Sequence, residues 1–337
     1  SNLVWPGIDN ISVWVRAAVY IVGLLIIGQG EVSLGVIVAI TSYASRFWQP
    51  IMNLGNIFNN FINNIAYLER IFETLDEPVT IDNAEEAKEM EPIQGEVTFE
   101  NVTFGYEPGK IVLDNVSFTV KPGESIALVG PTGAGKSTIV NVISRFYDVN
   151  EGRVLIDGQD VSKVTIKSLR SQMGIMLQDS FIFSGTIEDN IRYGKLDATE
   201  DEIVKASQTV CADDFIRRFQ DGYKTEVKER GSLLSQGQKQ LISFARTLLS
   251  DPAILVLDEA TSSIDVQTER ALQAGLNAML KGRTSFIIAH RLSTIKNCDR
   301  IMYIDKGGIT ECGSHDELMA KKGDYYRLYT SQMEDIA

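Results

Sequence analysis

Histidine and cysteine are scarce in this sequence, which has two histidines and three cysteines among 337 residues. Cys211, Cys298 and Cys312 lie far apart and share no metal-ligand spacing, so they do not indicate a metal site. We expect them to be reduced thiols facing a cytosolic redox environment. A signal-peptide pattern is also lacking, because neither a basic first segment nor a small-residue cleavage site accompanies the first apolar stretch.

Basic residues are outnumbered, with 32 Lys and Arg against 45 Asp and Glu. The resulting net charge of −13 and isoelectric point near 4.8 argue against nucleic acid as a main partner, because phosphate backbones select basic surfaces. The length suits about two domains. No internal repeat or low-complexity tract is visible.

The most informative stretch present is GPTGAGKST at residues 130–138, which matches G-x-x-x-x-G-K-[ST]. The apolar run 126–129 before it has the length of a buried strand, and residues 138–146 after it fit a helix. Glycines in such a turn let successive N–H groups and the helix N-terminus converge on an anion. The stretch therefore predicts a nucleoside triphosphate site made of Gly130, Pro131, Thr132, Gly133, Ala134, Gly135, Lys136, Ser137 and Thr138.

Each polar side chain of this loop has an expected task. Lys136 is expected to reach the β- and γ-phosphates, and the Ser137 hydroxyl is expected to ligate Mg²⁺. Downstream, the apolar run 254–257 ends in Asp258 and Glu259. Successive side chains of a strand point to opposite faces, so the two carboxylates should differ in role. We expect Asp258 to hold the hydration shell of Mg²⁺ and Glu259 to polarise the attacking water.

Two other polar residues end apolar runs. Gln178 follows the run 173–177, and His290 follows the run 286–289. Ligands of open α/β sheets gather at the carboxyl ends of the strands, so both residues are predicted to face the same crevice. A structural polar residue is the alternative interpretation of each.

The first 75 residues differ in composition from the rest. Apolar stretches predict two helical spans, at about 8–28 and 34–58, joined by a tight turn into an antiparallel membrane hairpin. A buried helical pair of a soluble protein is the alternative. The second helix is expected to continue to residue 75 as a cytosolic extension. Residues 76–94 are acidic and contain two prolines, which is typical of a linker.

From residue 95 the sequence is typical of a globular α/β domain that extends to residue 337. Short apolar runs alternating with helical stretches predict a mostly parallel sheet, with antiparallel strands near its start and a helix-rich middle. A capping box at residues 314–317 is expected to open the last helix.

A polar stripe follows one face of the second predicted span. It consists of residues spaced three or four apart, namely Arg46, Gln49, Asn53, Asn56, Asn60 and Asn63. Arg46, and Arg16 on the first span, lie roughly 18 Å from the turn at 1.5 Å per residue, near the middle of a bilayer core. A charge there should face protein or water, so Arg16, Arg46, Gln49, Asn53 and Asn56 are predicted to line a transport path. A helix–helix contact with polar hydrogen bonds is the alternative.

The motifs, in this order, resemble the C-terminal part of an ABC (ATP-binding cassette) exporter of the fused membrane-plus-nucleotide-domain type. In that resemblance Tyr106 matches the aromatic residue that stacks on adenine. Gln178 matches the Q-loop glutamine that contacts Mg²⁺, and His290 matches the switch histidine. Asp265 matches the D-loop aspartate. The signature sequence corresponds to Ser235, Gln236, Gly237 and Gln238, with Gln236 in place of the commoner glycine.

The resemblance implies a P-loop NTPase cassette with a mostly parallel sheet, an antiparallel β subdomain and a helical subdomain, preceded by the last two of six spans. It also implies ATP-driven export, in which Mg·ATP is hydrolysed between two cassettes of a homodimer or heterodimer. The expected location is a plasma membrane, with the cassette in the cytoplasm and a transported substrate of unknown identity. Residues 225–231 resemble the stretch that touches a partner's coupling helix, with Lys228 where glycine is usual.

Two other functions compete with export. An ATP-gated channel or regulatory subunit would bind nucleotide without efficient turnover, which Glu259 and His290 argue against. A soluble cassette ATPase would lack the apolar hairpin and would carry a less acidic surface.

Overall fold

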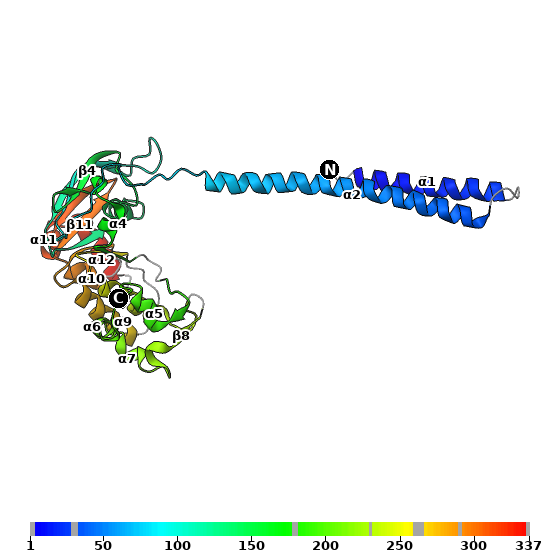
Figure 1. Cartoon of the computed structure of the whole chain (residues 1–337). Helices are drawn as coiled ribbons and strands as arrows, with labels where there is room; N and C mark the ends of the chain where they lie inside the picture. Colours follow the sequence, from blue (N-terminus) through cyan, green and yellow to red (C-terminus); the bar gives the residue numbers. More distant parts are fainter. Residues whose placement is uncertain are drawn as a thin grey trace. The chain divides into compact units, whose positions relative to one another are not determined.

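The computed structural model of this chain describes residues 4–27, 33–176, 181–228, 231–258, 266–288 and 292–334. The chain forms two compact units, Ser1–Thr80 and Ile81–Ala337. Figure 1 draws the helices and strands of each unit and labels some of them.

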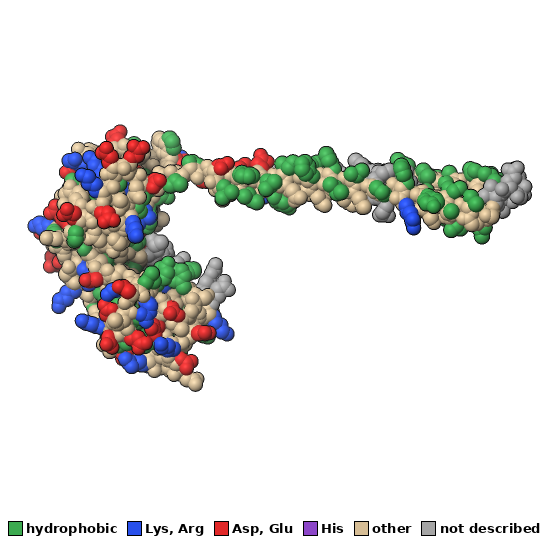
Figure 2. Space-filling view, in the orientation of Figure 1, with side chains coloured by type: hydrophobic (Ala, Val, Ile, Leu, Met, Phe, Trp, Pro, Cys, Tyr) green, Lys and Arg blue, Asp and Glu red, His purple; other side chains and the backbone are tan. Residues whose placement is uncertain are grey.

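The first unit is a pair of helices, α1 (Val4–Ile27) and α2 (Leu34–Leu75), as the apolar pattern predicts. Gly23 of α1 faces Ile37 of α2 so closely that an added Cβ would lie 2.6 Å from the Ile37 Cδ1 atom. Most other large apolar side chains of both helices are exposed in this unit (Figure 2). Among the helices that the structure describes, none combines the length and apolar composition of a membrane span.

The second unit is built on a six-stranded sheet. Its strands are β3 (Ser125–Val129), β6 (Met173–Met176), β9 (Ile254–Asp258), β10 (Thr284–Ile288), β11 (Arg300–Asp305) and β12 (Gly308–Gly313). They are ordered β12-β11-β3-β10-β9-β6, and all neighbouring pairs are parallel except β11 with β12. The mostly parallel core expected from the sequence is therefore confirmed.

Both faces of this sheet are buried, and alternate residues serve the two faces. Ile126 and Leu128 of β3 belong to one apolar cluster, whereas Ala127 and Val129 belong to the other. A strand buried on both sides needs a continuous apolar run, because successive side chains point to opposite faces. This explains why residues 126–129 read as an apolar block rather than an alternating pattern.

An antiparallel sheet packs on one side of this core. It consists of β1 (Val97–Phe104), β2 (Leu113–Val120), β4 (Glu151–Ile156) and β5 (Gln159–Asp160), in the order β2-β1-β4-β5. The inward residues of β1, including Phe99, join the same apolar cluster as Ile126 and Leu128. The antiparallel part predicted near the start of the domain is thus confirmed.

The remaining elements are mostly helices. They are α3 (Lys136–Ile143), α4 (Ile166–Arg170), α5 (Ile187–Arg192), α6 (Glu200–Thr209), α7 (Asp213–Ile216), α8 (Gln236–Leu249), α9 (Val266–Leu280), α10 (Leu292–Asn297), α11 (His315–Lys321) and α12 (Asp324–Glu334), with short 3₁₀ turns η1 (Val161–Lys163) and η2 (Gly222–Lys224) and a two-stranded ribbon of β7 (Gly185–Thr186) and β8 (Glu226–Val227). Helix α8 packs against α5, α6 and α9, which forms the expected helical subdomain.

Two helix boundaries differ from the sequence prediction. Helix α3 ends at Ile143 because Arg145 adopts a left-handed φ of 48°, which stops the helix. The Ser314 capping box opens α11 as expected, but α11 is not the last helix. Lys322, with a φ of 55°, ends it, and α12 follows.

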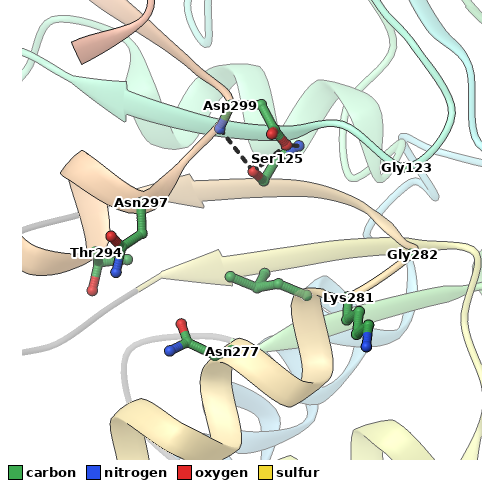
Figure 3. Close-up of a pocket in the computed structure, with 9 residues that line it drawn as sticks. Gly123, Ser125, Asn277, Lys281, Gly282, Thr294, Asn297 and Asp299 are labelled. Carbon is green, nitrogen blue, oxygen red and sulfur yellow. Dashed lines mark hydrogen bonds between the residues drawn. The ribbon is translucent and has the colours of Figure 1, made fainter. Parts of the chain in front are cut away.

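A polar pocket of about 250 Å³ lies at the amino ends of β3 and β10, the edge opposite their carboxyl ends (Figure 3). In it Ser125 donates to the Asp299 carboxylate from both its backbone N (2.8 Å) and its Oγ (2.6 Å). Asp299 in turn donates its backbone N–H to Ser125 Oγ. This reciprocal pair holds the first residue of β3 opposite the residue that precedes β11.

We expect Asp299→Ala to lower the free energy of unfolding by about 1–3 kcal/mol, because Ser125 is nearly buried and would lose its acceptor. Chemical denaturation of the cassette would measure the change. Asn297→Ala in the same pocket is the matched control, and its exposed position predicts a change within about 0.5 kcal/mol. Equal effects of the two substitutions would contradict the role given to the Ser125–Asp299 pair.

Candidate nucleotide-binding site

The phosphate loop begins directly after β3, where Gly130 has no room for a side chain. A Cβ on Gly130 would lie 2.1 Å from the backbone oxygen of Ile304 in β11, and the φ of Gly130 is 140°. Gly133 also has a positive φ of 81°, but an added Cβ would meet nothing within 4 Å. The loop is therefore pressed against the sheet at one end and open at its middle, where an anion has space to approach the backbone.

Lys136 is the first residue of α3 and folds back over the loop. Its Nζ donates to the backbone oxygens of Gly130 (2.9 Å) and Pro131 (2.8 Å). Burial lowers the pKa of Lys136, while the charge of Asp258 acts in the opposite direction. The charge of Asp258 therefore acts on Lys136 although the two residues lie far apart in the sequence.

Ser137 and Thr138 differ in exposure. Ser137 is exposed at the start of α3, whereas Thr138 is 4% exposed. The Thr138 hydroxyl lies 3.1 Å from the hydroxyl of Tyr106, which also accepts from the Asn141 amide. Tyr106 is thus tied to the first turns of the phosphate helix.

The ring of Tyr106 belongs to an aromatic cluster beside the loop. It meets Phe104 and Tyr147 edge to face, with ring centroids 5.0 and 4.9 Å apart. Tyr106 is 46% exposed, so much of its ring remains accessible. Tyr147 and Asn141 escaped the sequence analysis. The sequence does show an amide side chain, Asn141, within the helix after the loop and a tyrosine, Tyr147, shortly after that helix, and these positions could have indicated both residues.

The parallel register brings several strand ends to one edge. Ile288 of β10 pairs with Leu128 of β3 on one side and with Asp258 of β9 on the other. Met176 of β6 pairs with Leu257. The carboxyl ends that precede the phosphate loop and the other predicted polar residues therefore meet at the same edge, as expected. The predicted residues Gln178, Glu259, Asp265 and His290 lie outside the described residues.

The predicted signature begins α8, a 14-residue helix of the helical subdomain. Ser235 is the N-cap of α8, and its Oγ accepts from the backbone N of Gln238 while Gln238 Oε1 accepts from the backbone N of Ser235. Ser235 and Gln236 are exposed, and Gly237 is buried. An exposed N-terminus of a 14-residue helix carries a partial positive charge, which favours an anion.

The residues predicted to hold Mg²⁺ offer the right chemistry. Ser137 supplies a hydroxyl and Asp258 a carboxylate, and hard oxygen donors of this kind suit Mg²⁺. In the described part of the chain, no group of three or more His, Cys, Asp or Glu is arranged to hold a metal. Mg²⁺ in nucleotide sites commonly takes one or two protein oxygens and completes its shell with phosphates and water, so the two residues fit.

The predicted transport-path residues lie on the two helices of the first unit. Arg16 is half-buried on α1, and Arg46, Asn53 and Asn56 are exposed on α2. Gln49 is part of α2, but its side chain is outside the described part. Their common role stays a prediction.

Comparisons with known proteins agree on one family. Residues 113–262 match the model described as ABC transporter. YknV of Bacillus subtilis (strain 168), an uncharacterised ABC transporter ATP-binding protein, is 50% identical over 310 residues, which cover 92% of this chain and 51% of that protein. A fatty acid ABC transporter ATP-binding/permease protein of Mycobacterium bovis (strain ATCC BAA-935 / AF2122/97) is 44% identical over 332 residues, covering 97% of this chain and 52% of that protein.

A solved structure adds the fold. A bacterial Atm1-family ABC exporter with ATP bound gives a TM-score of 0.74 at 38% identity, and the similarity covers 96% of this chain and 57% of that chain. The chain spans about half the length of the curated relatives it matches. Because the family match runs from β2 through the phosphate loop and the strand that ends in Asp258, the resemblance inferred from the motifs is confirmed: the chain carries the cassette of an ABC transporter.

Proposed function

We propose that the chain binds and hydrolyses Mg·ATP and that hydrolysis drives export across a membrane. The observation that carries the proposal is the register of the parallel sheet, in which β10 joins β3, the strand before the phosphate loop, to β9, the strand that ends in Asp258. Lys136 would serve the phosphates and Asp258 would serve the metal, and phosphoryl transfer requires both at one edge of the sheet.

The chemistry follows from the placement of each residue. The loop backbone and Lys136 bind the β- and γ-phosphates, and Ser137 and Asp258 hold Mg²⁺, which neutralises charge on the phosphates when bound. For Lys136 to do so, its Nζ must exchange the carbonyls of Gly130 and Pro131 for phosphate oxygens. Glu259, next after Asp258, accepts a proton from the water that attacks the γ-phosphate. Gln178 and His290, next to the ends of β6 and β10, complete the site.

Glu259→Gln is the test of this chemistry. We expect ATP binding to persist and the turnover rate to fall by about 10²–10⁴-fold, because a general base is lost. Lys136→Ala should instead weaken binding, since it removes a phosphate contact. Fluorescent-nucleotide binding and steady-state ATPase assays in liposomes separate the two effects.

Glu96→Gln, the same substitution at an exposed position of the cassette, is the matched control. Near-normal turnover of Glu259→Gln would overturn the assignment. Nucleotide binding without any turnover in the unsubstituted protein would favour a gated channel or a regulatory subunit.

Tyr106 is proposed to stack on the adenine ring. Its half-exposed ring is braced by Phe104 and Tyr147, and a braced aromatic pays little entropy on binding. We expect Tyr106→Ala to raise the KM for ATP by an amount equivalent to about 1–3 kcal/mol of stacking, with little change in kcat. Tyr106→Phe is the control, because it keeps the ring and removes only the hydroxyl contacts to Thr138 and Asn141. A KM unchanged in Tyr106→Ala would refute the stacking role.

The site is proposed to be completed by a second cassette. Ser235 and the N-terminus of α8 offer hydrogen-bond donors for a γ-phosphate, yet they belong to the helical subdomain, whereas the phosphate loop follows β3 of the sheet. A head-to-tail pair would place the signature of one chain over the phosphate loop of the other. The partner is a second copy of this chain or a related half-transporter.

Export is proposed from the helical unit and from the relatives. Similar proteins are described as ATP-binding/permease proteins, and one is a fatty acid transporter. The exposed apolar side chains of α1 and α2 call for cover by lipid or by further helices (Figure 2). The polar residues Arg16, Arg46, Gln49, Asn53 and Asn56 would then face a path through the membrane domain, in a plasma membrane with the cassette in the cytoplasm.

Thiol accessibility tests this path. In a background without Cys211 and Cys312, cysteines at Asn53 and Asn56 should react with a water-soluble reagent at a rate that changes when ATP is trapped. Cysteines at Leu54 and Phe58, apolar positions of the same helix, should react slowly in both states. Equal, nucleotide-independent rates at all four positions would exclude a gated path along this stripe.

A further inference from the structure

Residues 81–94, here named the strap, are bonded along their length to the cassette. The backbone N of Met90 donates to Ser168 Oγ (2.8 Å), and the backbone N of Ile93 donates to Gln172 Oε1 (2.9 Å). Gln172 also donates from Nε2 to the backbone oxygen of Glu91. Met90 is 6% exposed and belongs to the apolar cluster of the sheet. The strap is therefore docked on α4 and the turn that follows it.

The start of the strap is held from a different element. Arg145, two residues beyond the end of α3, donates from Nη2 to the backbone oxygen of Asp82 (3.0 Å). Its Nη1 donates to the backbone oxygen of Val164 (2.9 Å), and its Nε pairs with Asp148 (2.8 Å). One guanidinium thus joins the strap, the turn before α4 and the chain that leaves the phosphate helix.

Because the Arg145 side chain is buried, each of its hydrogen bonds must be satisfied within the protein. The Arg145 side chain is 3% exposed, and a buried charge is tolerated only when its donors are paired. The planar fork of a guanidinium fixes the direction of each hydrogen bond, so a shift of one acceptor disturbs the other two. A lysine keeps the charge but cannot reproduce that fork.

A second arginine ties α3 to α4 at the same corner. Arg170 donates from Nη2 to the backbone oxygen of Arg145 (2.7 Å) and from Nε to that of Ser144 (3.2 Å). Its guanidinium also lies 4.8 Å from the centroid of the Phe146 ring. The carboxyl end of the phosphate helix, α4 and the strap therefore form one connected corner, remote from the loop that begins α3.

We propose that Arg145 is a positioning residue that couples the docking of the strap to the binding of nucleotide at the other end of α3. The inference rests on the proposed ATP binding at the phosphate loop. Helix α3 is eight residues long and packs on the sheet, so it transmits a displacement at Lys136 to Ser144 as a nearly rigid body. The strap follows α2 in the sequence after residues 76–80, so the coupling acts on the segment through which the chain enters the cassette.

Linkage makes the coupling reciprocal. If a docked strap favours nucleotide binding, then bound nucleotide must favour the docked strap by the same factor, and couplings of this kind commonly amount to about 5–150-fold. The strap amides of Lys88 and Met90 are suitable reporters, because each donates to an acceptor on the cassette.

The experiment is hydrogen exchange of the whole protein in liposomes, with and without Mg²⁺ and a non-hydrolysable ATP analogue. We expect exchange in residues 83–91 to slow by about 5-fold or more when nucleotide binds. Arg145→Lys should abolish that difference. Arg153→Lys is the matched control, because Arg153 pairs with Glu100 on the exposed face of β4 and has no contact with the strap in the described residues. It should keep the difference.

Steady-state kinetics give a second measurement, the KM for ATP, which would not change if Arg145 had a purely structural role. Arg145→Lys should raise the KM for ATP about 5-fold and leave kcat within twofold, because affinity is altered and not the chemistry. Gln172→Leu loosens the strap without touching α3 and should raise KM in the same direction. It keeps the proposal testable if Arg145→Lys fails to fold.

The coupling would be overturned if the hydrogen-exchange rate of the strap in the unsubstituted protein did not change with nucleotide while fluorescent-nucleotide binding was measured in the same sample. Absence of nucleotide binding itself would instead overturn the proposed function. If Arg145→Lys lowers the melting temperature but nucleotide still slows hydrogen exchange of the strap to the full extent, Arg145 has only a structural role.

Discussion

The contact between Gly130 and the backbone oxygen of Ile304 determines where the phosphate loop lies. With an added Cβ placed only 2.1 Å from that oxygen, the loop can pass over β11 only because residue 130 has no side chain. The loop is thereby pressed onto the sheet at the point where β3 ends. Lys136 and Ser137 at the start of α3 then follow after a short turn, at the edge of the sheet where β10 and β9 also end.

Burial of the sheet on both faces makes this placement rigid. The strands on either side of β3 are held in register by backbone hydrogen bonds and by two apolar clusters, so their carboxyl ends cannot move independently. Parallel strands present their carboxyl ends at one edge, which is why the polar residues just after the apolar runs 173–177, 254–257 and 286–289 were predicted to meet there. Among them the structure describes Asp258, which lies at that edge.

Local patterns predicted the buried strands at 126–129, 173–177, 254–257 and 286–289, the capping box of α11 and the phosphate loop, because each depends on residues close in sequence. They did not predict β11 and β12. Prediction failed where a single residue takes an unusual backbone conformation. Arg145 and Lys322 both have positive φ, which local sequence patterns do not reveal. Arg145 stops a helix that was predicted to reach residue 146, and Lys322 separates α11 from a further helix that was not predicted. Tyr147 and Asn141 were missed for another reason, since their proximity to Tyr106 depends on how β1 packs beside α3.

The docking of the strap on the cassette could not be predicted from the composition of residues 81–94. Its acidic side chains and its proline, Pro92, are typical of a linker, because such a composition favours contact of the side chains with water. The hydrogen bonds that dock residues 88–94 come largely from the backbone, which every residue carries, and their acceptors are side chains far along the sequence, such as Ser168 and Gln172. A segment can therefore be polar in composition and still be firmly attached. The segment through which the chain enters the cassette is thus fixed at the corner where the phosphate helix ends.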